Sequence, residues 1–101
     1  MIVVTGLIEV EEESREDAAK LAAGMAQETR KEEGCLAYGF YADIEAPNCF
    51  RIYEEWQDMA ALERHFATPH MAEFAKGLGA IKLLSMDVKK FEGGPKSPVR
   101  G

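Results

Sequence analysis

The chain has 101 residues, enough for one domain and too few for a second. Its 18 acidic and 12 basic residues give a formal net charge of −6, and the basic pairs form no stripe, so we expect no nucleic-acid partner. No apolar run approaches the ~20 residues that a membrane-spanning helix needs, and the start lacks the basic segment of a secretory signal. We therefore expect no membrane partner and a cytoplasmic location, with Cys35 and Cys49 as free thiols.

The first predicted strand covers residues 2–10, where β-branched side chains dominate. Its even positions, such as Ile8 and Val10, place aliphatic side chains on one face. Val3 and Leu7 make the other face largely apolar as well. A strand that is apolar on both sides must be covered on both sides.

A helix is expected to begin at Ser14, where Ser14 and Asp17 resemble a capping box, and its apolar residues recur at three- and four-residue steps to Thr29. Gly34 is the expected left-handed residue after this helix. The remaining predicted elements are strands at 35–44 and 49–56 joined by a turn, a helix at 59–66 capped by Asp58, a helix from Thr68-Pro69 to about Gly77, and a strand at 81–91.

The element order β-α-β-β-α-β predicts a ferredoxin-like α+β fold, with one four-stranded antiparallel sheet and both helices on one face. The predicted domain spans residues 1–92, and residues 93–101 are expected to form a flexible tail. Aromatic and aliphatic side chains are too abundant on the strands for the other face to be solvated. We therefore expect a homodimer whose open sheet faces pack together.

Several short motifs occur in order between residues 34 and 74, namely the run G-C-L-A-Y-G-F-Y at 34–41, P-N-x-F at 47–50, E-x-W at 54–56 and H-x-x-T-P-H at 65–70. This part of the chain resembles the antibiotic biosynthesis monooxygenase (ABM) domain family. The resemblance implies a dimeric α+β barrel. It also implies, less directly, the activities found in that family: cofactor-free quinol and anthrone oxygenation, haem degradation, and isomerisation of signalling-molecule derivatives.

The sequence shows no motif for a metal or an organic cofactor. His65 and His70 lie five residues apart across a proline-initiated break, unlike the i,i+4 pair of a helical zinc motif. A phosphate-binding glycine loop and a flavin or nicotinamide fingerprint are also missing. We therefore expect no metal and no cofactor, so that a substrate oxidised by O2 must supply the electrons itself. An electron-rich hydroquinone or anthrone does this once it has lost a proton.

His65 is the candidate catalytic base, because histidine titrates near neutrality. It lies on the predicted helix 59–66 beside Ala61 and Leu62, at the border of the apolar stripe. The alternative role for His65 is a packing or capping residue that ties the helices to the sheet. His70 falls in the first turn of the next helix, where we expect a surface or structural role.

Five residues are candidates for substrate binding: Trp56, Glu54, Tyr38, Tyr53 and Phe74. Trp56 either stacks on a planar substrate or fills the core at the corner between strand and helix. Glu54 shares the face of Trp56, where a lone buried charge is unfavourable. It either pairs with a cation such as Arg51 or Lys82, or keeps a raised pKa and orients His65.

The leading hypothesis is a cofactor-independent monooxygenase or quinol oxidase that acts on a small aromatic substrate. The alternative is a non-catalytic or stress-related dimer that binds a small ligand. Haem-degrading relatives carry a ligating histidine near the segment 73–75 and an asparagine near Gly6, and this chain has neither. Isomerisation of a phosphorylated signal would need a basic phosphate site, which the acidic composition disfavours.

Overall fold

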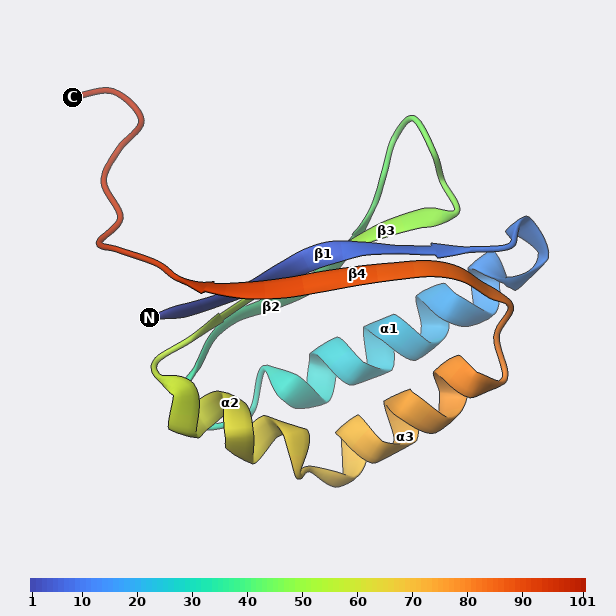
Figure 1. Ribbon diagram of the computed structural model, residues 1–101, viewed down its shortest axis with the longest axis horizontal. Coiled ribbons are helices and arrows are strands. Elements are labelled where there is room, and N and C mark those ends of the chain that lie inside the picture. The colour runs from blue at the N-terminus through green and yellow to red at the C-terminus, as the bar shows by residue number, and fades with distance from the viewer.

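A computed structural model describes residues 1–101 of the protein. Its elements are β1 (Ile2–Val10), the short 3-10 helix η1 (Glu12–Ser14), α1 (Arg15–Thr29), β2 (Cys35–Ala42), β3 (Cys49–Trp56), α2 (Met59–Phe66), α3 (Pro69–Gly79) and β4 (Leu83–Glu92). The strands form one antiparallel sheet in the order β2-β3-β1-β4. The helices all lie on one face of it (Figure 1). The predicted ferredoxin-like α+β fold is confirmed.

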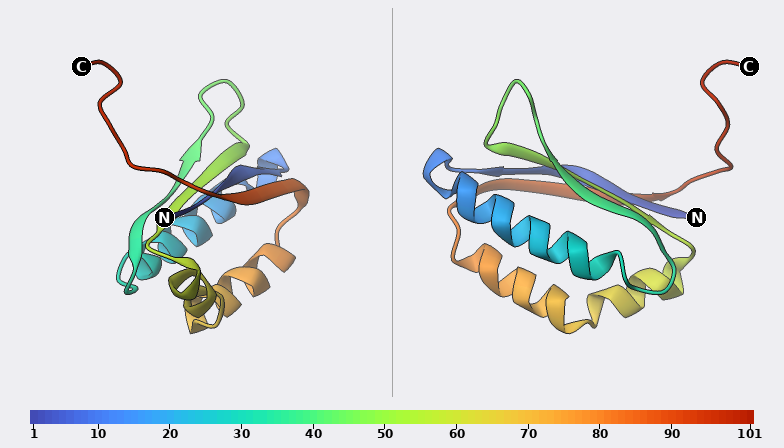
Figure 2. Two further views of the ribbon diagram at one scale, coloured as in Figure 1. Left: turned by 60° about the vertical axis from the view of Figure 1, so that its left-hand side comes forward. Right: turned by 180° about the vertical axis from the view of Figure 1, so that it is seen from behind.

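The core lies between the sheet and the helices, and α1 and α3 run side by side beneath the sheet (Figure 2). Alternation along β1 turns its even residues toward the helices, as the pattern predicts. Val10 is fully buried there, and Ile2 packs with Met25 of α1 and Trp56 of β3. The helix-facing side of the sheet therefore positions everything that follows.

The two caps predicted for the later helices are confirmed. Asp58 accepts a hydrogen bond from the Ala61 amide at 2.9 Å, and Thr68 Oγ1 accepts one from the Met71 amide at 3.3 Å. Both residues have the extended backbone that an N-cap requires. Only two residues separate the end of α2 from the start of α3, so the two helices meet in a sharp corner.

The predicted capping box at Ser14 is wrong. The turn η1 precedes α1, and Ser14 already has helical backbone angles, φ −95° and ψ −3°. A residue in this conformation does not aim its side chain at the first free amides of the helix. The Ser14 hydroxyl instead accepts a hydrogen bond from the amide of Lys82 at 3.3 Å, which links the start of α1 to the chain entering β4.

The bounds of β2 and β4 differ from the predicted ones. β2 ends at Ala42 because Asp43 begins a turn, in which its side chain accepts a hydrogen bond from the Glu45 amide at 2.8 Å. β4 begins at Leu83, next to a shift in register between Glu9 and Val10 of β1. The left-handed backbone predicted for Gly34 is confirmed, with φ +86°.

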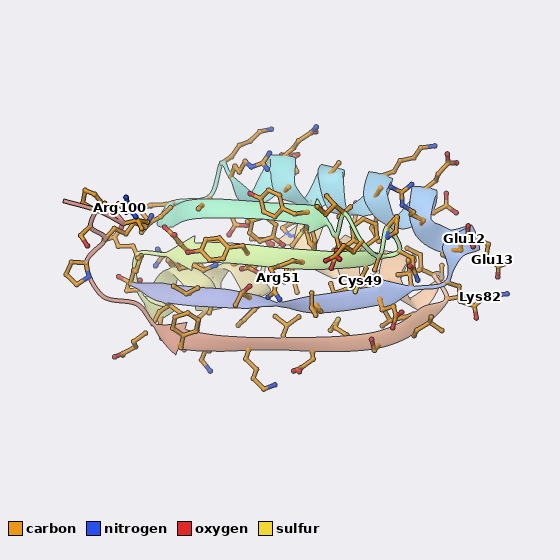
Figure 3. All side chains as sticks on the ribbon, turned by 90° about the horizontal axis from the view of Figure 1, so that it is seen from above. Glu12, Glu13, Cys49, Arg51, Lys82 and Arg100 are labelled. Atoms are coloured by element: carbon orange, nitrogen blue, oxygen red, sulfur yellow. The ribbon has the colours of Figure 1, made fainter.

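The other face of the sheet carries no helix (Figure 3). Arg51 lies near its centre, and Leu7, Tyr41 and Phe91 are exposed among the large apolar residues of the chain. Beyond β4 the chain leaves the sheet on the side away from the helices (Figure 1), and the Lys96 amine lies 2.6 Å from a Glu55 carboxylate oxygen. No helix of this fold has both the length and the apolar character to cross a membrane.

Candidate functional site

A cavity of about 630 Å³ lies between the sheet and the helices α2 and α3. Twelve of its 16 lining residues are hydrophobic, as is typical of small-molecule sites. The lining residues are Val4, Ile8, Tyr38, Ile52, Glu54, Leu62, His65, Phe66, Met71, Phe74, Ala75, Leu78, Met86, Val88, Lys89 and Lys90. Its volume is within the range of small-molecule sites in proteins, roughly 300–1,000 Å³.

Strand register builds the floor of the cavity. Residues paired across an antiparallel sheet point to the same side, so each row of partners presents one line of side chains. Val4 pairs with Glu54 on one neighbouring strand and with Lys90 on the other. This row therefore runs from a buried carboxyl group on β3 to an exposed amine on the edge strand β4.

His65 is 2% exposed and projects from α2 against the cavity. Its Nδ1 lies 2.7 Å from Oε2 of Glu32, which is in the connection between α1 and β2. A carboxylate only accepts, so Nδ1 carries the hydrogen, and in the neutral ring Nε2 keeps the free electron pair. The carboxylate thus fixes the tautomer in which the other ring nitrogen has a free electron pair to accept a proton.

The same Glu32 oxygen also lies 2.6 Å from Nε2 of His70, at the start of α3. The predicted absence of a metal-ligand cluster rested on spacing along the chain, and the fold brings these three side chains within 4.8 Å of one another. The two N···O distances are those of charge-assisted hydrogen bonds. Ligand atoms around a tetrahedral zinc ion, each ~2.0–2.1 Å from the metal, stand farther apart than this. The arrangement is a hydrogen-bonded triad.

Sequence reasoning missed Glu32. The residue lies 33 positions before His65 in a segment rich in acidic residues, and nothing in its neighbourhood separates it from Glu33. Gly34 was a usable signal, because its left-handed backbone turns the chain from α1 into β2. The turn sets Glu32 beside the corner between α2 and α3. A contact of this kind follows from packing of distant segments and not from a local pattern.

Glu54 is buried against Trp56, whose indole Nε1 donates a hydrogen bond to Glu54 Oε1 at 2.8 Å. Burial raises the pKa of Glu54 from its ordinary value of 4.5 to about 7. The expected ion pair with Arg51 or Lys82 is wrong. Arg51 points to the other face of the sheet, and Lys82 pairs with a carboxylate of the segment before α1.

The raised pKa was the alternative considered for Glu54, and the structure supports it. The accompanying idea that Glu54 orients His65 is wrong, because Glu32 occupies the only ring nitrogen of His65 that is hydrogen-bonded. Glu54 instead lines the cavity as a second ionisable residue beside His65. Its partner is Trp56 and not the imidazole.

Four of the six candidate residues line the cavity together, namely Tyr38, Glu54, His65 and Phe74. Burial raises the pKa of the Tyr38 phenol far above its usual range, so this hydroxyl stays neutral. Trp56 is fully buried with its ring centre 4.8 Å from that of His65, which makes it a packing residue behind the imidazole rather than part of the cavity wall. Tyr53 lies on the opposite face of the sheet, where its hydroxyl donates to Glu55.

Fold and site together define a small α+β protein with an apolar cavity bordered by an imidazole. Residues 1–77 match the family described as antibiotic biosynthesis monooxygenase. The protein belongs to this ABM family. The segment that matches includes β1, the triad and most of the cavity wall, and it ends before β4.

Curated relatives extend this picture. The chain is 39% identical over 75 residues to the Synechocystis protein sll1783, matching 74% of this chain and only about half, 51%, of that protein. It is 37% identical over 78 residues to the Bacillus subtilis protein named "Putative monooxygenase YcnE", over 76% of this chain and 82% of the relative. It is 32% identical over 74 residues to the Escherichia coli protein named "Probable quinol monooxygenase YgiN", over 63% of this chain and 68% of the relative.

Among solved structures, a protein from Deinococcus radiodurans superimposes with a TM-score of 0.92 over the full length of both chains, at 27% sequence identity. The similarity therefore includes β4 and the residues after it, which lie beyond the family match.

Proposed function

We propose that this protein is a cofactor-independent monooxygenase or quinol oxidase that uses O2 on a small hydroquinone- or anthrone-like substrate. The observation that carries the proposal is the placement of His65 on the wall of an apolar cavity, with Nδ1 bound to Glu32. This leaves Nε2 as the group that removes a proton from the substrate. A histidine held by a carboxylate is a common arrangement for a general base.

Deprotonation is the step that the residues would assist. A hydroquinone passes one proton to His65 Nε2, and the resulting anion gives one electron to O2, which leaves a semiquinone and superoxide. Transfer of the second electron and proton completes the conversion of hydroquinone and O2 to quinone and hydrogen peroxide. On an anthrone-like CH2 group the two radicals combine to a hydroperoxide, which loses water to leave a carbonyl group. The substrate supplies all the electrons in either case, two from the hydroquinone and four from the anthrone-like CH2 group.

The cavity suits such a substrate in shape and polarity. Leu62, Phe74 and Tyr38 offer apolar and aromatic surface for a ring. Glu54 titrates near neutrality and can donate to or accept from a substrate oxygen, depending on its protonation. The exclusion of water from an apolar cavity would also keep the radical pair together. The name of the relative YgiN, a probable quinol monooxygenase at 32% identity, supports a quinol as the substrate class.

The test is O2 uptake with menadiol, corrected for the rate without protein. We expect uptake above that rate, and a fall of at least 100-fold for His65→Gln, the scale on which general bases contribute. Glu63→Gln is the matched control, since Glu63 is exposed on the same helix. Fluorescence of the single tryptophan, Trp56, reports whether each variant still folds and binds menadione. Uptake that is equal in His65→Gln and the wild type would overturn the proposal.

The alternative of a ligand-binding protein without catalysis uses the same cavity and needs no base. Quenching of Trp56 by menadione together with no O2 uptake above background would favour it.

We also propose that the protein is a cytoplasmic homodimer joined through the open sheet face. The support for the dimer is the exposure of Leu7, Tyr41 and Phe91, with no helix on that side. The support for a reducing location is that Cys35 and Cys49 are both free.

A further inference from the structure

The triad has an unusual stoichiometry, because one carboxylate oxygen serves two imidazoles. Oε2 of Glu32 lies 2.7 Å from His65 Nδ1 and 2.6 Å from His70 Nε2. The centres of the two rings are 6.1 Å apart. A single negative charge compensates one protonated imidazole, so a second positive charge at this separation is opposed.

The triad also reaches from the cavity to the surface. Side-chain exposure increases along it, from 2% for His65 to 12% for Glu32 and 22% for His70. His65 borders the cavity, whereas His70 borders a separate groove between α1 and α3, and Phe74 lies in the wall of both. The two histidines therefore meet different environments while they share one carboxylate.

We propose that His70 is a positioning residue coupled to His65 through Glu32. When His65 takes up a proton in the cavity, His70 releases a proton into the groove. The consequence for catalysis rests on the proposed function, whereas the coupling of the two histidines does not. Nothing in the spacing of the H-x-x-T-P-H motif assigns this role to its second histidine. The role is inferred from the Glu32 oxygen that both histidines share.

The proton count balances without any other reactant. In the proposed exchange, the starting state has His70 protonated on both nitrogens, Glu32 ionised and His65 neutral. The substrate O–H bond breaks, His65 Nε2 gains the proton, and His70 releases the proton of Nδ1 to water in the groove while its Nε2–H stays bonded to Glu32. The triad has no net charge before or after this step. When His65 returns its proton to the reduced oxygen product, His70 takes one back from water.

Other charged or titratable groups surround the triad. They are Lys20, Glu28 and Lys31 of α1, Glu73 of α3, Arg64 of α2 near Gly34, Cys35 and Tyr38 of β2, and Glu54 of β3. None of their side chains forms a hydrogen bond with a side chain of the three members, so the shared carboxylate remains the direct side-chain link. Glu73 borders the same groove as His70 and is exposed, which makes it a suitable control position.

The test is a titration of the imidazole signals by NMR, which is simple because the chain has two histidines. In His70→Gln, where the amide still donates to Glu32 without a charge, we expect the titration of His65 to move to higher pH by about 0.5–2 pH units. The titration of His70 should move in the same direction in His65→Gln. Glu73→Gln should move either titration by less than half of that amount.

A second measurement ties the coupling to the reaction. The pH at which O2 uptake is lost on the acid side should move upward in His70→Gln by the same amount as the NMR titration of His65. Unchanged titration of each histidine when the other is replaced would overturn the proposal. Binding of Zn2+ that shifts both imidazole signals at equimolar metal would overturn it too, because the triad would then be a metal site. An NMR shift without any O2 uptake would leave the coupling in place and refute the proposed function instead.

Discussion

The indole nitrogen of Trp56 donates a 2.8 Å hydrogen bond to Oε1 of Glu54, two residues earlier on the same strand face. The bond stabilises the ionised carboxyl, and burial opposes it more strongly, so the pKa of Glu54 rises to about 7. The bond also directs one oxygen of Glu54 toward the fully buried indole beside His65. Packing of the tryptophan and the protonation of a cavity residue are therefore linked.

Glu54→Gln should make stability less dependent on pH. The pKa of Glu54 is about 7 in the folded protein and 4.5 in the unfolded chain, so the folded state binds more protons between these pH values. The wild type therefore loses stability as pH rises from 4.5 to about 7. The variant lacks this loss. We expect it to be more stable than the wild type by up to about 3 kcal/mol above pH 7, and equal below pH 4.5, in urea unfolding at several pH values.

The neighbouring Glu55→Gln should have the opposite sign. Hydrogen bonds from Lys96 and Tyr53 lower the pKa of Glu55, so its ionised form contributes stability that is present above the unfolded pKa and is lost as pH falls. This variant should be less stable than the wild type at pH 7 and similar to it in acid. If both variants changed stability in the same direction, the net charge of the protein, and not the position of the carboxyl group in the sheet, would control their stability.

Ala75→Trp should reduce ligand binding by filling the cavity. Ala75 lines the cavity yet is exposed on α3, so the large side chain can be added without disrupting the core. We expect menadione to bind at least ten-fold more weakly, equivalent to about 1.4 kcal/mol. The matched control is Ala72→Trp, exposed on the same helix and outside the cavity wall, which should bind normally. Calorimetric titration measures both, and equal loss in the two variants would mean that the ligand binds elsewhere.

Gly34→Ala should destabilise the protein and weaken the triad. Gly34 has φ +86°, and a Cβ atom there would lie 2.5 Å from the Cβ of Ala61. The left-handed backbone alone costs a non-glycine residue about 1–2 kcal/mol. Because Gly34 directs the turn that carries Glu32, O2 uptake should fall as well.

Gly24→Ala is the control for that variant. Gly24 lies within α1 with open space around it, and alanine is preferred there by about 0.8–1 kcal/mol. Thermal unfolding should show a lower Tm for Gly34→Ala and a higher Tm for Gly24→Ala. A stable Gly34→Ala protein with full activity would contradict the role of this turn.

Leu7→Glu should convert the proposed dimer to a monomer. Leu7 is 40% exposed near the centre of the open face, where a buried carboxylate would be opposed in a face-to-face dimer. Light scattering coupled to size exclusion should give the mass of one chain for this variant and of two for the wild type. Ile44→Glu, at a fully exposed position of the β2–β3 turn, should leave the mass unchanged. A wild-type protein that elutes as a monomer would refute the dimer.

Local patterns predicted the elements well where the controlling interactions are local. The caps at Asp58 and Thr68 depend on residues three positions away, and both are confirmed. The capping prediction for Ser14 failed because this residue has helical backbone angles and its hydroxyl accepts a hydrogen bond from the amide of Lys82, 68 residues later. Alternation along β3 correctly placed Glu54 and Trp56 on one face. Tyr53, expected as a substrate-binding residue, lies on the other face, away from the cavity.

The order of apolar and polar residues by itself determined the fold and the buried face of the sheet. Alternation and helical periodicity act over a few residues and set the strands and helices, and burial of apolar surface then favours one arrangement of these elements. It also marked His65 as a residue at the edge of the core. Only the tertiary structure decided which carboxylate meets the two histidines. Glu32 reaches them because the connection after α1 meets the corner between α2 and α3, more than 30 residues later in the chain, and such a meeting depends on how whole elements pack.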